Sequence, residues 1–445
     1  MIGDTSLTQA FMKAFFSELI RKNIRYCILH NAEDVASGTS HDIDMCVDVT
    51  SLTEAATILQ QTASEQGWDM HLQTGSIRDT FNAKSYHYHY IDEQAQRITL
   101  IHFDFVPVTA WKGREIISNA TLLAGADESG LFRSAAQEVM AVVDLFPHLL
   151  YDGYIKDKYK QRIHQAFLSI PEKIAPIICQ FLPAPLARKI ITYAQERRWE
   201  AILELRDTIT QQALLRAPKR RWAHFCHILN KLMKPTGLMV AFQGVDGSGK
   251  STVINALPDI LGNSFTGDTF NYYHWRPGFL KAEKKLTNEG RPISDTRPHL
   301  HKPDGRLKSF LKLGFHTLDY FFGYWCRVRK QVSQGHLVVF DRYFYDFYVD
   351  KKRYCLTVGD AVIRIFQLFI PEPDLTFLLI GDATQIHARK NELSIEEINN
   401  QTQRILKIRN RIERTATIDA GMSIFNVRFS VCKTILQTLA RKSHG

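Results

Sequence analysis

Hydrophobic and polar residues alternate over several short runs in the first part of the chain, a period of two that is typical of strands. The last two of these runs are separated by a short polar segment and predict a hairpin. A serine–x–x–glutamate pattern at 51–54 matches a capping box and predicts a helix that continues to about Gly67. Residues 1–127 are therefore expected to form a mixed α/β region. The predicted strands are RYCIL (25–29), DIDMCVDV (42–49), SYHYHYI (85–91) and RITLIHFDF (97–105).

The hydrophobic period changes to that of helices after this region, and few strand patterns occur before residue 235. From Gly237 onward, apolar runs that predict buried strands alternate with helical patterns, as is typical of an α/β domain. We therefore expect three parts: residues 1–127, a helical connector at 128–235 and a third domain at 236–445. The connector is divided into short helices by prolines, namely Pro171, Pro176, Pro183 and Pro185.

The length of 445 residues is too great for one ordinary core and predicts two or three domains. The net charge of +10 favours anionic partners such as nucleotides, nucleic acid or acidic lipid headgroups. Seven cysteines are scattered without a C-x-x-C pair, which indicates free or buried thiols in a reducing compartment. The amino-terminal pattern is that of an amphipathic helix and not of a signal peptide, and no apolar run is long enough for a membrane span. We expect a cytoplasmic soluble protein.

A glycine-rich loop of the form G-x-x-x-x-G-K-S lies between the apolar run LMVAFQ (238–243) and the helical pattern STVINALPDIL (251–261). In such a loop the glycines allow backbone N–H groups to surround an anion, and the helix N-terminus adds the positive end of its dipole. Lys250 would bridge the β- and γ-phosphates of ATP, and the Ser251 hydroxyl would coordinate Mg²⁺. The alternative is a glycine-rich turn without a ligand. The predicted ATP-binding residues are Gly244, Asp246, Gly247, Ser248, Gly249, Lys250, Ser251 and Thr252.

Several segments in the last part of the chain resemble, in the same order, the motifs of the thymidylate kinase family. The resemblance implies a nucleoside-monophosphate-kinase-like fold with a parallel sheet, helices on both faces and a mobile lid. It also implies ATP and Mg²⁺ as cofactors. The matching segments are FQGVDGSGKST (242–252) for the phosphate loop, LVVFDRYFYD (337–346) for the strand ending in D-R-Y, PDLTFLL (373–379) for the P-D-L-T strand, HARKNELSIEEI (387–398) for the lid, and TIDAGMSIFNV (417–427) for the last strand and adenine-side loop.

Phosphoryl transfer depends mainly on positioning and on the neutralisation of negative charge. Asp341 ends an apolar strand, where its carboxylate can hold Mg²⁺ through water, and Arg342 can bind the phosphate of the acceptor or another anion. Arg389 and Lys390 lie on a predicted helix and can close over the transferring group. Lys250, Asp341, Arg342 and Arg389 are therefore the predicted catalytic residues. The structural alternatives are an ion pair at the strand end and, for Arg389, a solvated helix face.

The predicted acceptor region departs from the thymidylate kinase motifs. Gln243 stands where the family usually has glutamate, and YYHWRPGFL (272–280) lacks the glutamate of the family's R-E-P-G segment. The residues that follow are rich in aromatic and basic side chains. We therefore expect thymidylate to be a poor acceptor. The predicted acceptor contacts are His274, Arg276, Tyr343, Arg353 and Tyr354.

A different group of carboxylates lies near the amino terminus. Asp42 and Asp44 are two residues apart in a predicted strand, so their side chains point to the same face. Asp104 lies in another predicted strand, and three converging carboxylates can hold Mg²⁺ for attack on a nucleotide α-phosphate. Over roughly the first 110 residues this pattern is similar to the minimal nucleotidyltransferases, but His30 and Asn31 replace the family's G-[GS] turn. The alternatives are the fold without activity, a divergent site, and surface aspartates on an edge strand.

The expected architecture is a carboxyl-terminal P-loop kinase domain preceded by a nucleotidyltransferase-like α/β domain and a helical connector. The kinase domain is expected to be Mg·ATP-dependent. The layout resembles that of proteins of bacterial surface-polysaccharide pathways, which implies a sugar, a polyol or their phosphate as the acceptor. The alternatives are a nucleotidyltransferase with an accessory kinase domain, and a regulatory or defence module that senses nucleotide. The basic segment 216–222 is interpreted as a solvated linker, so nucleic acid is not the expected partner. Peripheral membrane contact and a homodimer are both compatible with the sequence.

Overall fold

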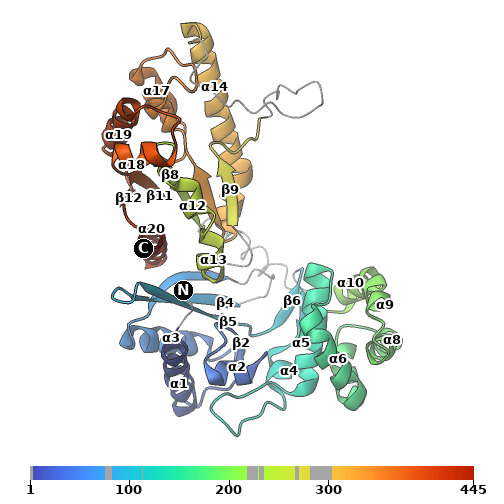
Figure 1. The fold of residues 1–445 in the computed structure, drawn as a ribbon. Coiled ribbons are helices and arrows are strands. Elements are labelled where there is room, and N and C mark those ends of the chain that lie inside the picture. The colour runs from blue at the N-terminus through green and yellow to red at the C-terminus, as the bar shows by residue number, and fades with distance from the viewer. Residues whose placement is uncertain are drawn as a thin grey trace. The chain divides into compact units, whose positions relative to one another are not determined.

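A computed structural model describes residues 4–75, 83–112, 114–217, 229, 235–265, 270–280 and 303–444. The chain divides into two compact units, one of residues 1–92 and 97–233 and the other of residues 234–445 with the short turn 93–96. Each unit contains a five-stranded sheet (Figure 1). Within the described ranges, no helix combines the length and the apolar character needed to cross a bilayer. Most of the basic segment 216–222 lies outside the described residues.

The sheet of the first unit is mixed. Its strand order is β1-β2-β5-β4-β3, in which β2 and β5 run parallel and the other neighbours run antiparallel. The pairing of Asp92 with Arg97 closes the β4–β5 hairpin, which confirms the hairpin predicted from the alternating pattern. A separate two-stranded sheet follows it. The strands are β1 (Tyr26–Ile28), β2 (Asp42–Val47), β3 (Asp69–Gly75), β4 (Lys84–Asp92), β5 (Arg97–Phe105), β6 (Thr109–Trp111) and β7 (Arg114–Ile117).

Side chains alternate between the two faces of this five-stranded sheet, as strand geometry requires. Ile43, Met45 and Phe103 lie on the apolar face, where they share a core with Phe11 and Phe15 of the first helix. The residues between them point to the opposite face, so the apolar core determines which polar side chains are gathered there. This polar face carries Asp42, Asp44, Ser85, His87, His102 and Asp104.

The helices that follow the first sheet do not form a core separate from it. Cys27, Cys46 and Trp111 from the sheet region pack in the same cluster as Phe146 and Ile190. The described part of the expected connector therefore shares a core with residues 1–127, and the three-part division of the chain remains a prediction. The helices are α1 (Thr5–Arg21), α2 (Ala32–Ser37), α3 (Leu52–Glu65), α4 (Asn119–Leu123), α5 (Gln137–Pro147), a π-helical turn (His148–Asp152), α6 (Asp157–Ser169), α7 (Pro171–Cys179), α8 (Ala184–Gln195), α9 (Trp199–Glu204) and α10 (Arg206–Arg216).

The helix predicted from the serine–x–x–glutamate pattern is present as α3, but the capping box is not. Ser51 precedes the helix, and its side chain makes no capping hydrogen bond. Its ψ of 3° differs from the extended backbone that places an N-cap side chain over the helix end. A side-chain cap does occur at α1, where Asp4 accepts from the backbone N–H groups of Ser6 and Leu7.

The five-stranded sheet of the second unit is entirely parallel, with the order β12-β11-β8-β10-β9. The strands β8 and β10 are buried along their whole length, which explains their continuous apolar runs. A parallel sheet with helices is the architecture expected for residues 236–445, and it is consistent with a P-loop kinase fold. The strands are β8 (Leu238–Gly244), β9 (Phe270–His274), β10 (Leu337–Asp341), β11 (Leu375–Ile380) and β12 (Thr415–Asp419).

The single helix predicted over 251–261 is divided into two short helices. The first ends at Ile254, and the second begins at Leu257 with Pro258 in its first turn. Proline lacks the N–H group that would continue the first helix, and it is favoured at a helix start. The helices of this unit are α12 (Lys250–Ile254), α13 (Leu257–Leu261), a 3₁₀ turn (Gly262–Ser264), α14 (Arg306–Gly323), a π-helical turn (Tyr324–Val328), α15 (Arg329–Ser333), α16 (Asp346–Val349), α17 (Asp360–Gln367), α18 (Ala383–Arg389), α19 (Ile395–Arg409) and α20 (Ile424–His444).

Candidate active sites

The phosphate loop connects β8 to α12 and requires glycine at both of its ends. A Cβ atom at Gly244 would lie 2.6 Å from Ser248 Oγ and 2.9 Å from Leu379 O, which is too close for either contact. Gly249 has a φ of +87°, a left-handed conformation that disfavours any side chain. The backbone at Gly244 and Gly249 therefore explains why the motif has glycine at these two positions.

Lys250, the first residue of α12, is held against the loop that precedes it. Its Nζ donates to the carbonyl oxygens of Gly244 at 2.7 Å and Val245 at 3.0 Å. Burial, and then the nearby charge of Arg342, lower the pKa of Lys250 to about 8. A phosphate bound in the loop would favour the charged ammonium group and raise this pKa again.

Asp341, at the end of β10, lies directly beside the loop. Ser251 Oγ donates to Asp341 Oδ2 at 3.2 Å, and the Tyr272 hydroxyl donates to the same oxygen at 3.3 Å. The other oxygen, Oδ1, is buried and has no hydrogen-bond partner in the described part of the chain. A buried carboxylate oxygen without a partner is unfavourable unless a cation pairs with it. Ser251 and Asp341 therefore fit a Mg²⁺ ion with oxygen ligands.

Arg342 is bound by carboxylates from two directions. Its Nη1 donates to both oxygens of Asp346, at 3.1 and 2.9 Å, and its Nη2 donates to Asp246 in the loop. Arg353 donates to the second oxygen of Asp246 at 2.8 Å, and the Tyr354 hydroxyl donates to Asp346 at 2.6 Å. Burial acts against the charge of Arg342, but Asp346 and Asp246 outweigh it and raise its pKa. Arg342 thus ties the loop to α16, and its predicted contact with the acceptor's phosphate remains a prediction.

The predicted lid residues lie at the end of α18. Arg389 donates to the backbone carbonyl of Ala420 at 2.8 Å, and Lys390 pairs with Glu392 at 3.2 Å on the surface. A Cβ atom at Gly247 would lie 3.1 Å from Lys390 Cβ, so the end of α18 lies against the phosphate loop. The lid and the catalytic role of Arg389 both remain predictions.

The predicted acceptor residues differ in how far they are available to a ligand. His274, at the end of the edge strand β9, has a side chain that is 64% exposed and lies 4.0 Å from Asp341 Oδ2. Arg276 is paired with the buried Asp319 at 3.1 Å. Tyr343 is buried, and its hydroxyl donates to a backbone carbonyl. Of these three predicted residues, His274 is the one that presents its side chain beside the candidate Mg²⁺ position.

Aromatic side chains fill the space beside the R-P-G segment. Trp275 stacks on Tyr354 with ring centroids 4.7 Å apart, and His316 and Phe347 contact the same indole edge-on. Trp275 has a φ of +72°, which is uncommon for a bulky residue. Burial, and then the charge of Arg276, lower the pKa of His316 to about 3, so that this imidazole is neutral. The chain's own rings therefore occupy this region.

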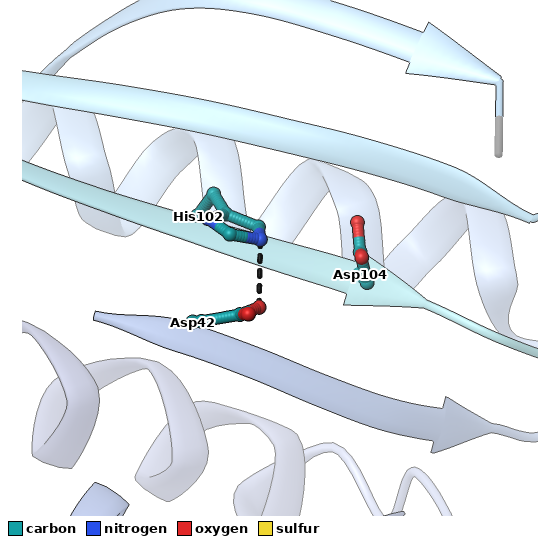
Figure 2. Close-up of side chains that lie close together, drawn as sticks. All are labelled: Asp42, His102 and Asp104. Atoms are coloured by element: carbon teal, nitrogen blue, oxygen red, sulfur yellow. Dashed lines mark ion pairs between the residues drawn. The ribbon is translucent and has the colours of Figure 1, made fainter. Parts of the chain in front are cut away.

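A second candidate site lies on the polar face of the first sheet (Figure 2). The parallel strands β2 and β5 place Asp42 opposite His102 and Asp44 opposite Asp104. Asp42, His102 and Asp104 each offer one ligand atom, and these atoms lie within 4.8 Å of one another. His102 Nε2 lies 2.6 Å from Asp42 Oδ1. The structure thus brings Asp42 and Asp104 together, keeps Asp44 in register beside them, and adds His102, which the sequence did not single out.

The charges of this group shift its pKa values. Burial acts against the charged form of His102, but the hydrogen bond and the charge of Asp42 outweigh it and raise the pKa to about 9. Burial raises the pKa of Asp104 to about 6, while the charge of His102 opposes this rise and that of Asp44 adds to it. The neighbouring strand β4 supports both side chains. Ser85 Oγ donates to Asp104, and the His87 ring stacks on the His102 ring with centroids 4.8 Å apart.

His30 and Asn31 form the turn that replaces the G-[GS] of the nucleotidyltransferase pattern. Asn31 has a φ of +50° and a ψ of +45°, a left-handed conformation that asparagine tolerates better than most residues. His30 Nδ1 lies 2.9 Å from Asp144, and Arg162 donates to both oxygens of Asp144 and to Asn31 Oδ1. Asp144 and Arg162 come from α5 and α6 and were not predicted. The helical region therefore fixes this turn.

Comparison with known proteins relates less than half of the chain to thymidylate kinases. The chain is 24% identical over 214 residues to the probable thymidylate kinase of Archaeoglobus fulgidus, a match that covers 47% of this chain and 100% of that protein. The solved thymidylate kinase of Ehrlichia chaffeensis shares 19% identity, with 45% of this chain and 98% of that chain covered and a TM-score of 0.30. No protein-family model matches the chain. The chain is thus similar to thymidylate kinase over about 45% of its length, and the nucleotidyltransferase-like domain remains a prediction.

Proposed function

We propose that the second unit is an Mg·ATP-dependent phosphotransferase of thymidylate-kinase type, and that its acceptor is a sugar, a polyol or one of their phosphates. The observation that carries the proposal is the meeting of Lys250, Ser251 and Asp341 at the carboxyl ends of the adjacent parallel strands β8 and β10. The similarity to a probable thymidylate kinase over 214 residues supports it.

The residues of the site have separate tasks in this proposal. The loop N–H groups and Lys250 would hold the β- and γ-phosphates, while Ser251 and Asp341 would hold the metal ion. Bound Mg²⁺ supplies neutralisation of the charge on the transferring group. Arg342, through its two carboxylate partners, would keep the loop in the conformation that receives the nucleotide.

Several features favour an acceptor other than thymidylate. Arg276 of the R-P-G segment is engaged by a buried aspartate, and the adjacent Trp275 stacks on Tyr354. These contacts leave little of the segment free for a nucleoside monophosphate. Tyr272 and His274 project beside Asp341 from the edge strand and offer hydrogen-bonding groups suited to a hydroxyl-rich acceptor.

An ADP-release assay over nucleoside monophosphates, sugars, polyols and sugar phosphates tests both parts of the proposal. Lys250→Ala should lower turnover by orders of magnitude while the fold is retained, because it removes the positive charge that would neutralise the β- and γ-phosphates. Lys407→Ala, an exposed change on α19, is the control and should leave turnover unchanged. Full activity of the Lys250 variant would contradict the site. Thymidylate turnover of roughly 1–100 per second would contradict the acceptor class.

The first unit has nucleotidyl transfer as its own candidate function. The observation in its favour is that Asp42, Asp44 and Asp104 share one face through the parallel register of β2 and β5. The double variant Asp42→Asn with Asp44→Asn should lose pyrophosphate release and keep nearly all kinase turnover. Loss of kinase turnover in a folded double variant would indicate one composite site. Absence of pyrophosphate release by the unmutated chain with all four nucleoside triphosphates would reject this candidate and leave a binding scaffold.

A further inference from the structure

The site on the polar face of the first sheet has a ligand set that differs from the one predicted. Three aspartates were expected, and the closest group consists of two carboxylates and one imidazole. We propose that Asp42, His102 and Asp104 form a binding site for a first-row transition-metal dication, such as Mn²⁺ or Zn²⁺, in preference to Mg²⁺. Figure 2 shows the three side chains together, with the imidazole of His102 directed at Asp42.

The scaffold that carries these ligands consists of paired strands rather than loops. Asp42 and His102 are direct partners across β2 and β5, and Asp104 follows two residues after His102 on the same face. The next strand, β4, places His87 opposite His102 and Ser85 opposite Asp104. Ser85 donates to Asp104, and such support behind a ligand fixes its orientation for a metal.

The charge on this face favours a dication. Asp42 and Asp104 lie there with His102 in one group of ligand atoms, and Asp44 is the partner of Asp104 across the two strands. The guanidinium group of Arg162 is bound by Asp144, outside this group of ligands. A bound dication would be paired with the carboxylates of Asp42 and Asp104, and His102 would release its ring proton to coordinate it.

The imidazole decides between the classes of metal. Mg²⁺ prefers oxygen ligands and retains its waters, whereas imidazole nitrogen is a favourable ligand for transition metals. Three protein ligands also leave positions open for water or a phosphate oxygen, as in catalytic metal sites. The oxygen-only pair Ser251 and Asp341 of the second unit provides an internal contrast within the same chain. This inference concerns the site of the proposed nucleotidyl transfer, but metal binding is measured without nucleotide and is judged separately from that reaction.

Equilibrium dialysis of the full chain tests the proposal. Metal-free protein is dialysed against micromolar Mn²⁺ or Zn²⁺ in the presence of millimolar Mg²⁺ and without nucleotide. Bound metal is then counted by mass spectrometry, with electron paramagnetic resonance as a second readout for Mn²⁺. We expect about one equivalent of transition metal to be retained despite the excess of Mg²⁺. His102→Asn and Asp42→Ala should each weaken this binding by roughly tenfold or more.

Two control variants make the result specific. His164→Asn on α6 removes a histidine that bonds the Ala194 carbonyl, and Ser251→Ala removes the candidate Mg²⁺ ligand of the second unit; both should retain the metal. Asp42 is exposed, so Asp42→Ala should fold even if His102→Asn does not, and circular dichroism checks both. The proposal is overturned if no metal is retained, if Mg²⁺ competes as well as Mn²⁺ on a molar basis, or if a folded Asp42 or His102 variant binds normally. Metal retention without pyrophosphate release would support the cation site and reject nucleotidyl transfer.

Discussion

Replacement of Asp346 by asparagine tests whether the buried arginine network holds the phosphate loop of the second unit. The side chains of Arg342 and Asp346 are 5% and 1% exposed, so the pair is almost completely removed from water. Asp346 accepts two hydrogen bonds from Arg342 and one from Tyr354. The substitution preserves the size of the side chain, removes its charge, and leaves Asp246 as the remaining described ion-pair partner of Arg342.

The expected effect follows from the burial of this pair. Removing one partner of a buried ion pair costs about 3–5 kcal/mol, and the retained bond to Asp246 favours the lower end of that range. Since about 1.4 kcal/mol corresponds to a factor of ten, opening of the adjacent strands should become roughly 100-fold more frequent. Asp360→Asn is the matched control, because Asp360 pairs with Lys351 at 2.6 Å with side chains that are 55% and 32% exposed. That exposed pair should contribute less than about 1 kcal/mol.

Hydrogen exchange followed by mass spectrometry measures this opening in the intact chain. Amides of β8 and β10 should exchange roughly 100-fold faster in the Asp346→Asn variant and less than about fivefold faster in the Asp360→Asn control. Amides of β4 and β5 in the first unit serve as an internal reference and should keep their rates. Equal rates for the two variants in β8 and β10 would refute the assignment of Arg342 and Asp346 as a stabilising buried pair.

Further outcomes are expected from single side chains. Burial and the charge of Arg276 lower the pKa of His316 to about 3, so its stabilising contribution is complete above its unfolded pKa of about 6.5 and is lost as the pH falls toward 3. Thermal unfolding between pH 7 and 4 should show a shallower pH dependence in His316→Phe. Gly249→Ala, at a φ of +87°, should weaken ATP binding measured by calorimetry while the fold remains. Asn31→Ala should destabilise the first unit by about 1 kcal/mol more than Asn31→Gly in thermal unfolding, because both lose the Oδ1 acceptor and only alanine places a Cβ in the left-handed conformation.

The phosphate loop and Asp341 were predictable because the signals that mark them are local. An apolar run, a glycine spacing and a strand end can each be recognised within about ten residues of sequence. A parallel sheet then brings the carboxyl ends of its strands to one edge. The engagement of Arg276 was not predictable in this way. Its partner, Asp319, lies 43 residues away on α14 and also accepts from the backbone N–H groups of Gly278 and Leu280. Nothing near Arg276 in the sequence indicates whether its charge faces an acceptor or a buried carboxylate.

The site on the polar face of the first sheet shows how strand register determines which polar side chains meet, which the hydrophobic pattern alone leaves open. A slip of one residue between β2 and β5 would move Ile43 and Phe103 out of the core, so the apolar pattern excludes it. A slip of two residues keeps every apolar side chain on its face, yet it would place Asp104, in place of His102, opposite Asp42. The observed register, with Ile43 beside Phe103, instead brings an imidazole to the carboxylate. In the sequence, His102 is two residues from Asp104, just as Asp42 is two residues from Asp44. That spacing places His102 on the polar face but does not show that it lies opposite Asp42. Core packing determines the register, and the register brings in the imidazole that changes the class of metal favoured by the site.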